Sequence, residues 1–208
     1  MLDFEKLEAI AKDLMKKRQV HLQRETGSVY DHGLRVSKAV LRLRELALPG
    51  DASMDENLRA AGLFHDLGKG IEPHGHYGAV LMRDILKGMA DEKQTEIICR
   101  MIEVHDDRCK GGGKHDKYTG VLQDADLIDH FGTYDIWMVF NDAAYLKEGI
   151  GWAAERFDNL ENYYNIHLPL LNYPVSVEIA KEKRAFEREF VKRLQWESKG
   201  EYAKPWSL

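Results

Sequence analysis

Apolar side chains recur every three or four residues along most of this 208-residue chain, which is the spacing of one face of an α-helix, while strand-like alternation is scarce. Five helical stripes precede residue 106, around residues 7–14, 36–43, 58–62, 78–85 and 98–102. Three more helices are expected over about 119–133, about 134–147 and from Ser176 to about Glu197. We therefore expect an all-α fold in a single domain over residues 1–208.

Polar and glycine-rich segments mark the ends of these helices. The segment "LPGD" closes the second helix, and "DDRCKGGGKHDK" at 106–117 is the one clear long loop. Ser176, with Glu178 nearby, suggests a capped start for the last helix.

The composition excludes several classes of protein. A net charge of −5 at pH 7 argues against a general binder of nucleic-acid polymers or anionic membranes, so a small anionic substrate would need a local positive site. No run of about 18 apolar residues predicts a membrane span. The acidic, amphipathic start is unlike a secretory signal, and two cysteines without a CxxC spacing fit a reducing compartment. We expect a cytoplasmic protein, and the sequence sets no oligomeric state.

Four histidines lie on the apolar stripes of four separate helices, each at a helix end: His32, His65, His74 and His105. Each stands four and seven residues from stripe positions of its own helix, so its side chain is expected to point to the core. A single inward histidine is usually a hydrogen-bonded core residue, and burying one without a partner costs about 1–3 kcal/mol. One shared metal site would use all four. Imidazole nitrogens suit Mn, Fe, Co, Ni or Zn, and a carboxylate adds charge balance.

Carboxylates for such a site come from two segments. In "GLFHDLGKG" the helix ends beside His65, so the backbone can turn both His65 and Asp66 towards one centre. A second carboxylate is expected in "VLQDADLIDHFG" (121–132), where periodicity leaves both Asp124 and Asp126 open.

The ordered set of motifs resembles the HD-domain metal-dependent phosphohydrolase superfamily, and in particular its small bacterial hydrolases. The matching segments are "DHGLRV" (31–36), "AAGLFHDLGK" (60–69), "HGHYGA" (74–79), "MIEVHDD" (101–107), "LQDADLIDHFG" (122–132) and "VSVEIAKEKRAFEREFVKRL" (175–194). The motifs cover about residues 25–135. The resemblance implies an HD-domain helical bundle with a metal site in its core. The helices of residues 134–197 would pack on this bundle. The resemblance also assigns the second carboxylate ligand to Asp126.

The resemblance further implies a ligand set and a reaction. The ligands of a first divalent metal would be His32, His65, Asp66 and Asp126, and a second ion would be held by His74, His105 and the bridging Asp66. One or two ions of Mn, Fe, Co or Ni would fit, with Mg or Zn as further candidates. A metal-activated water would attack the phosphorus of a small phosphate ester or nucleotide. Asp66 would take part in catalysis. The positions of two cations add to this: Lys69, three residues after Asp66, is expected to act in catalysis and to bind the substrate phosphate, and Arg35, one turn after His32, is expected to bind it as well. On position alone, Lys69 would be a solvated lysine that faces the carbonyl dipole at a helix end.

Two alternative functions stay open within the same superfamily. The six ligands also resemble those of HD-type mixed-valence diiron oxygenases, which use dioxygen. An HD signalling or binding module with an inactive site is the other alternative, although the complete ligand set argues against it. Lys69 stands where the single-metal nucleotidases of the superfamily carry an acid, so the chain departs from that group.

Other polar residues have plainer interpretations. His76 rivals His74 as a ligand, but it shares a face with polar residues and is expected to be half-exposed. The dipeptide His115-Asp116 lies in the glycine-rich loop without a helix behind it and is interpreted as coincidence. Asp106 is expected at the surface or behind the ligands.

The glycine-rich loop and the aromatic residues each have two interpretations. "KGGGK" (110–114) is a flexible connector, or a lid that places Lys110 or Lys114 over an anionic substrate. The aromatic set is expected in the core rather than as a base-stacking platform: Trp137, Phe140, Tyr145, Trp152, Tyr163 and Tyr164.

Overall fold

The computed structural model describes residues 1–201, without the side chains of residues 158 and 159. Over that range the chain is helical with no strand, as predicted. The elements are α1 (Phe4–Met15), α2 (Ser28–Ala47), α3 (Asp55–Phe64), α4 (His74–Leu86), α5 (Glu92–Glu103), α6 (Lys117–Asp129), α7 (Thr133–Leu146), α8 (Ile150–His167), the 3₁₀ turn η1 (Leu168–Leu170) and α9 (Pro174–Glu197). The predicted domain also includes residues 202–208, which lie outside the described range. No described helix is both long and apolar enough to cross a membrane.

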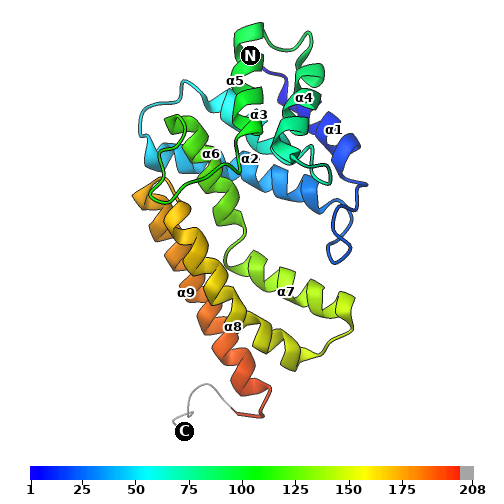
Figure 1. Ribbon diagram of the computed structural model, residues 1–208, viewed down its shortest axis with the longest axis vertical. Helices are drawn as coiled ribbons and strands as arrows, with labels where there is room; N and C mark the ends of the chain where they lie inside the picture. Colours follow the sequence, from blue (N-terminus) through cyan, green and yellow to red (C-terminus); the bar gives the residue numbers. More distant parts are fainter. Residues whose placement is uncertain (202–208) are drawn as a thin grey trace.

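The helices form two groups, and the long helix α9 contacts both of them (Figure 1). Helices α1 to α6 make the upper group in that view, around a large core that includes Phe64 and Ile102. Helices α7 and α8 lie below it with the C-terminal part of α9, around a smaller core that includes Phe157 and Val191. Because α9 also packs against α2 and α6, the C-terminal helices are joined to the motif-bearing helices.

The structure corrects several details of the predicted helices. Helix α8 has no counterpart in the prediction, although Ala153, Phe157 and Leu160 bury one of its faces. Helix α9 begins at Pro174 without a side-chain cap, and Ser176 is fully buried inside its first turn rather than capping it. Helix α6 ends at Asp129, four residues earlier than predicted.

The predicted aromatic set divides between core and surface. Tyr164 is buried, and Phe140 and Trp152 pack against the smaller core. Trp137 and Tyr145 are each 50% exposed, so their predicted place in the core is wrong. Both lie on α7, whose main helix contacts are with α8 and α9.

A glycine lets α2 and α3 approach closely enough for their histidines to meet. A Cβ atom on Gly33 would stand 2.4 Å from the backbone oxygen of Leu63, a distance that no side chain tolerates. Gly33 follows His32, and Leu63 lies two residues before His65. The close approach therefore brings the His32 and His65 backbones together.

A glycine also allows the close approach of α4 and α5. A Cβ atom on Gly75 would stand 2.5 Å from the backbone oxygen of Glu103. Gly75 follows His74, and Glu103 lies two residues before His105. Glycine at this position brings the second pair of histidines together.

Candidate metal centre

The six predicted ligands meet in the core of the upper helix group. His32 lies near the start of α2, His74 begins α4, and Asp126 lies within α6, while three others follow directly after helices: His65 and Asp66 after α3, and His105 after α5. All six are buried, with exposed fractions between 0% and 8%. The structure brings together every residue that the sequence predicted as a ligand.

His32, His65 and the two carboxylates form one half of the centre. The Nε2 atoms of His32 and His65 lie 3.1 Å apart. Asp126 Oδ1 stands 3.0 Å from His32 Nε2 and 3.5 Å from His65 Nε2. Asp66 Oδ2 lies 3.9 Å from His65 Nε2. His32, His65 and Asp66 offer ligand atoms within 4.8 Å of one another, which can surround one ion, and Asp126 stands beside both histidines.

His74 and His105 form the other half. Their Nε2 atoms are 3.2 Å apart, and Asp66 Oδ1 lies 3.5 Å from the first and 3.6 Å from the second. Asp66 therefore turns one carboxylate oxygen to each half. Its position between the two sets of imidazoles is the geometry of a bridging ligand.

Each of the four imidazoles is oriented by an oxygen that faces its Nδ1 atom. The acceptors are the Asp129 carboxylate for His32, Gly62 O for His65, the Glu72 carboxylate for His74 and Ile102 O for His105, at 2.7–3.1 Å. An imidazole that donates from Nδ1 presents the lone pair of Nε2. All four Nε2 atoms thus point into the centre, as in histidine ligands of metals.

The donor set fits divalent transition metals. In each histidine pair the two Nε2 atoms face each other, and whenever both rings are neutral with hydrogen on Nδ1 their Nε2 lone pairs repel. A cation between the rings removes that repulsion. Imidazole nitrogens together with carboxylate oxygens are the ligands of Mn, Fe, Co and Ni sites.

The charges of the centre favour a cation as well. Burial opposes the ionisation of Asp66 and Asp126, but the attraction of His65 and hydrogen bonds with other histidines outweigh it and hold both pKa values well below the usual range. Burial also opposes the charge on His32, yet hydrogen bonds with Asp126 and Asp129 raise its pKa to about 9. Two ionised carboxylates, those of Asp66 and Asp126, therefore lie among the histidines of the core.

Asp129 and Arg35 support His32 from behind. Arg35 Nε and Nη2 donate to the Asp129 carboxylate at 2.8–3.1 Å, and the guanidinium lies over the Tyr134 ring, 3.4 Å from its centroid. Sequence reasoning missed Asp129, although it stands three residues after Asp126 on the same helix face. Arg35, predicted to bind the substrate phosphate, has part of its donor capacity engaged by Asp129.

Arg108 and His130 were also missed. Arg108 lies in the turn after α5, and its Nη2 atom donates to Asp126 Oδ2 at 2.5 Å. Helical periodicity gives no information about a residue in such a turn. His130 Nε2 lies 3.7 Å from Asp126 Oδ1, one helical turn after it. Burial and the nearby His32 lower the pKa of His130 to about 4, so it is neutral at pH 7.

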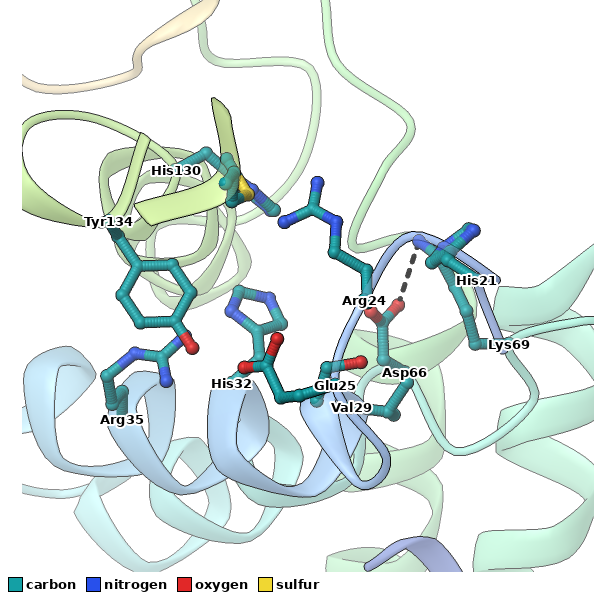
Figure 2. Close-up of a pocket in the computed structure, with 12 residues that line it drawn as sticks. His21, Arg24, Glu25, Val29, His32, Arg35, Asp66, Lys69, His130 and Tyr134 are labelled. Atoms are coloured by element: carbon teal, nitrogen blue, oxygen red, sulfur yellow. Dashed lines mark hydrogen bonds and ion pairs between the residues drawn. The ribbon is translucent and has the colours of Figure 1, made fainter. Parts of the chain in front are cut away.

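A cavity opens from the His32 side of the centre (Figure 2). Lys69 and Arg35, the two predicted phosphate contacts, both line it, together with Arg24 from the segment before α2. Lys69 Nζ stands 3.3 Å from Asp66 Oδ1. The cavity therefore joins His32 and Asp66 of the centre to three cationic side chains, which gives an acidic protein a local positive site.

A second cavity borders the other half of the centre. Its walls include His74, His105, Arg108 and Tyr163. Asp66, Lys69 and His130 line both cavities, so the centre is bordered on two sides.

His76 and the dipeptide His115-Asp116 lie apart from the six ligands, whereas Asp106 lies beside His74. His76 is exposed and pairs with Glu103 at 3.5 Å. His115 faces the Asp107 carboxylate, and Asp116 caps α6 by accepting from the backbone of its first turn. Asp106 is half-exposed, with Oδ2 3.7 Å from His74 Nε2.

Asp124 is buried and turned away from the centre. Its carboxylate accepts hydrogen bonds at 2.8–3.1 Å from the backbone N–H groups of Asn172 and Tyr173 and from the Asn172 side chain. The glycine-rich loop is attached at the same place, since Gly113 N–H donates to Asn172 Oδ1. Asp124 thus fixes the start of α9.

A known family of domains matches the part of the chain that carries all six residues of the centre. Residues 29–130 match the sequence model of the HD domain. No curated protein sequence matches the chain.

Solved structures of similar fold include three bacterial proteins. YpgQ from Bacillus subtilis, in complex with ADP, is 15% identical, with a TM-score of 0.64 over 93% of this chain and 96% of that one. An HD-superfamily hydrolase from Bacillus thuringiensis is 17% identical, with a TM-score of 0.70 over 95% and 97%. A predicted HD-superfamily hydrolase from an uncultured Thermotogales bacterium is 19% identical, with a TM-score of 0.61 over 93% and 92%. The likeness concerns the fold and extends over nearly the whole of each chain.

Proposed function

Because the chain belongs to the HD-domain family and gathers four imidazoles around a shared Asp66, we propose that it is a metal-dependent phosphohydrolase acting on a small phosphate ester or nucleotide. The observation that carries this proposal is the position of Asp66, with one oxygen towards each histidine pair and Lys69 beside it. Acidic and basic groups arranged in this way suit the binding of metal ions and of a phosphoryl group next to them.

Two overlapping ligand sets would hold the ions. The first set is His32, His65, Asp66 and Asp126, and the second is His74, His105 and Asp66. Mn, Fe, Co and Ni suit these donors best, and Mg or Zn are further candidates. When bound, such ions lower the pKa of water and neutralise phosphoryl oxygens.

The chain's own residues then bind and orient the substrate. Lys69 lines both cavities and would place its ammonium group against the phosphoryl oxygens, where charge develops in the transition state. Arg35 would bind the same group with the N–H donors that Asp129 leaves free, while its pair with Asp129 keeps His32 in position. Arg108 would hold Asp126 from the other side.

A nucleotide is one of the two proposed substrate types. The B. subtilis YpgQ structure, which shares this fold over most of its length, contains ADP. The cationic cavity beside the centre supports an anionic substrate of either type.

The proposal is tested by phosphate release from p-nitrophenyl phosphate and from ADP, with Mn, Co, Ni or Fe(II) added in turn. The wild-type protein should release phosphate with at least one ion, also in anaerobic buffer. Asp66→Ala should abolish activity, Lys69→Ala should lower it by about tenfold or more, and His76→Ala should leave it unchanged. Turnover that requires dioxygen, or full activity in Asp66→Ala, would contradict the proposal.

A further inference from the structure

The segment between α1 and α2, residues 16–27, has a fixed path although most of it lacks helical structure. The Gln19 side-chain amide donates to the backbone oxygens of His21 and Arg24, at 3.2 and 2.7 Å, and Thr26 donates to Gln19 Oε1 at 2.9 Å. Gly27 N–H donates to Arg18 O at 2.8 Å and closes the segment on itself. The backbone around Arg24 is therefore held by several hydrogen bonds.

Side chains of this segment also attach it to the walls of the first cavity. Arg18 donates to the backbone oxygens of Leu67 and Lys69, in the turn that carries Asp66. Lys16 pairs with Asp31 of α2 at 2.6 Å. The segment is thus fastened both to the proposed catalytic turn and to the helix of His32.

Arg24 differs from the other cations near the cavity because no carboxylate of the described residues forms an ion pair with its guanidinium. Lys16 is paired with Asp31, and Arg35 with Asp129. Among the described residues, no acidic side chain lies within 4.0 Å of the Arg24 guanidinium. Glu25 lines the same cavity but receives a hydrogen bond from Asn141 of α7.

The Arg24 guanidinium points into the open part of the cavity. Figure 2 shows it above His32, between His130 and the pair of Asp66 and Lys69. His21 lies beside Lys69, and burial, Lys69 and Arg24 lower the pKa of His21, which leaves it neutral at pH 7. The cavity thus has, besides Lys69 and Arg35, a further cationic position at Arg24.

We propose that residues 16–27 form an anion-recognition loop in which Arg24 binds a second phosphate of the substrate, next to the phosphoryl group at Lys69. A substrate with one phosphate would leave Arg24 unpaired. The matching substrate class carries two adjacent phosphates, as nucleoside diphosphates and other phosphoanhydrides do. This inference rests on the proposed function for the position of the first phosphate.

The test measures binding without turnover. The probes are methylenediphosphonate, whose P–C–P link is not hydrolysed, and methylphosphonate, which has one anionic group. Calorimetry on Mn-loaded protein, with metal content checked before and after, should show tighter binding of the diphosphonate. Arg24→Gln should weaken diphosphonate binding about tenfold to a hundredfold, as expected for a lost charge-assisted hydrogen bond, and change methylphosphonate binding less than about twofold.

A matched control removes a charge from the same segment outside the cavity. Lys17 is exposed and does not line it, so Lys17→Gln should leave both affinities unchanged. Equal losses for both probes in Arg24→Gln, or no loss for the diphosphonate, would overturn the inference. Because neither probe is hydrolysed, this result is independent of whether the protein releases phosphate from any ester.

Gln19 is a positioning residue in this scheme, and a double-mutant cycle separates that role from a general structural one. Gln19→Ala should weaken diphosphonate binding about threefold in the wild-type background and have no effect in the Arg24→Gln background. An equal loss in both backgrounds would show that Gln19 does not act through Arg24.

Discussion

The Nε2 atoms of His32 and His65 lie 3.1 Å apart, while the Nδ1 atom of each ring faces an oxygen on its other side. His74 and His105 repeat this relationship at 3.2 Å. Rings held in this way are oriented before any ion arrives, because the hydrogen bonds at Nδ1 fix their direction. The lone pairs that face each other are the reason to expect a strong response to metal.

Metal removal should therefore lower the stability of the fold. An ion at about 100 times its Kd contributes about 2.7 kcal/mol, which corresponds to a fall in Tm of about 5–10 °C for a chain of this size. Thermal unfolding before and after chelation, with metal loss verified by mass spectrometry, checks this, and added Mn should restore the Tm. An unchanged Tm after verified metal loss would contradict a metal site in the core.

Asp129→Asn should weaken metal binding although Asp129 does not face the centre. Asparagine still accepts from His32 Nδ1, but it lacks the charge that supports the imidazole and pairs with Arg35. Loss of such a supporting carboxylate typically costs about 10- to 100-fold in metal affinity. Titration with Mn measures the effect, with the exposed Asp13→Asn as control. Equal Mn affinities for Asp129→Asn and Asp13→Asn would show that Asp129 does not contribute to metal binding.

Asp124→Ala should destabilise the fold and leave the metal content unchanged. Its carboxylate accepts backbone hydrogen bonds from Asn172 and Tyr173, and the loss of these buried bonds should cost about 2–4 kcal/mol. Asp126→Ala should instead remove metal. Denaturant unfolding and metal analysis of both variants separate the two roles, and metal loss in Asp124→Ala would reverse the assignment.

The sequence predicts the histidine positions because a helix repeats every 3.6 residues, so stripe membership fixes which side chains point inwards. It leaves Asp124 and Asp126 open because α6 is buried on nearly every side, and its periodicity selects no face. The motif resemblance, not the periodicity, selects Asp126, and the structure places Asp126 beside His32.

Interactions across the core carry no such sequence signal. Arg108 meets Asp126 from an irregular turn, and Arg24 reaches the cavity from a connecting segment, so no periodic pattern indicates either. Helix α8 was missed although its buried residues Ala153, Phe157, Leu160 and Tyr164 have helical spacing. Pro174 at the first turn, rather than a capping Ser176, sets the start of α9.

Asp135→Asn should stabilise the protein at neutral pH and progressively less below it. Burial and the nearby Glu187 raise the pKa of Asp135 to about 7, against the opposing effect of Arg184, Arg24 and Arg156. A carboxyl group whose pKa is raised on folding contributes stability below its unfolded pKa and loses it as the pH rises through the folded value.

The stabilisation by Asp135→Asn should therefore begin above about pH 4, grow up to about pH 7 and then level off, reaching about 1–3 kcal/mol. Denaturant unfolding of both proteins at pH 5, 6, 7 and 8 gives the curve. A difference that is constant with pH, or that falls as the pH rises, would show that Asp135 is ionised in the folded protein throughout.

The number of ions per chain tests the central claim most directly, because only His74 and His105 distinguish a two-ion centre from a one-ion centre built on the other four ligands. Mass spectrometry of Mn-loaded protein should give about two ions per chain for the wild type and about one for His105→Ala, with phosphate release strongly reduced in the variant. His76→Ala should keep both ions. One ion in the wild type, together with full phosphate release by His105→Ala, would contradict the two-metal centre.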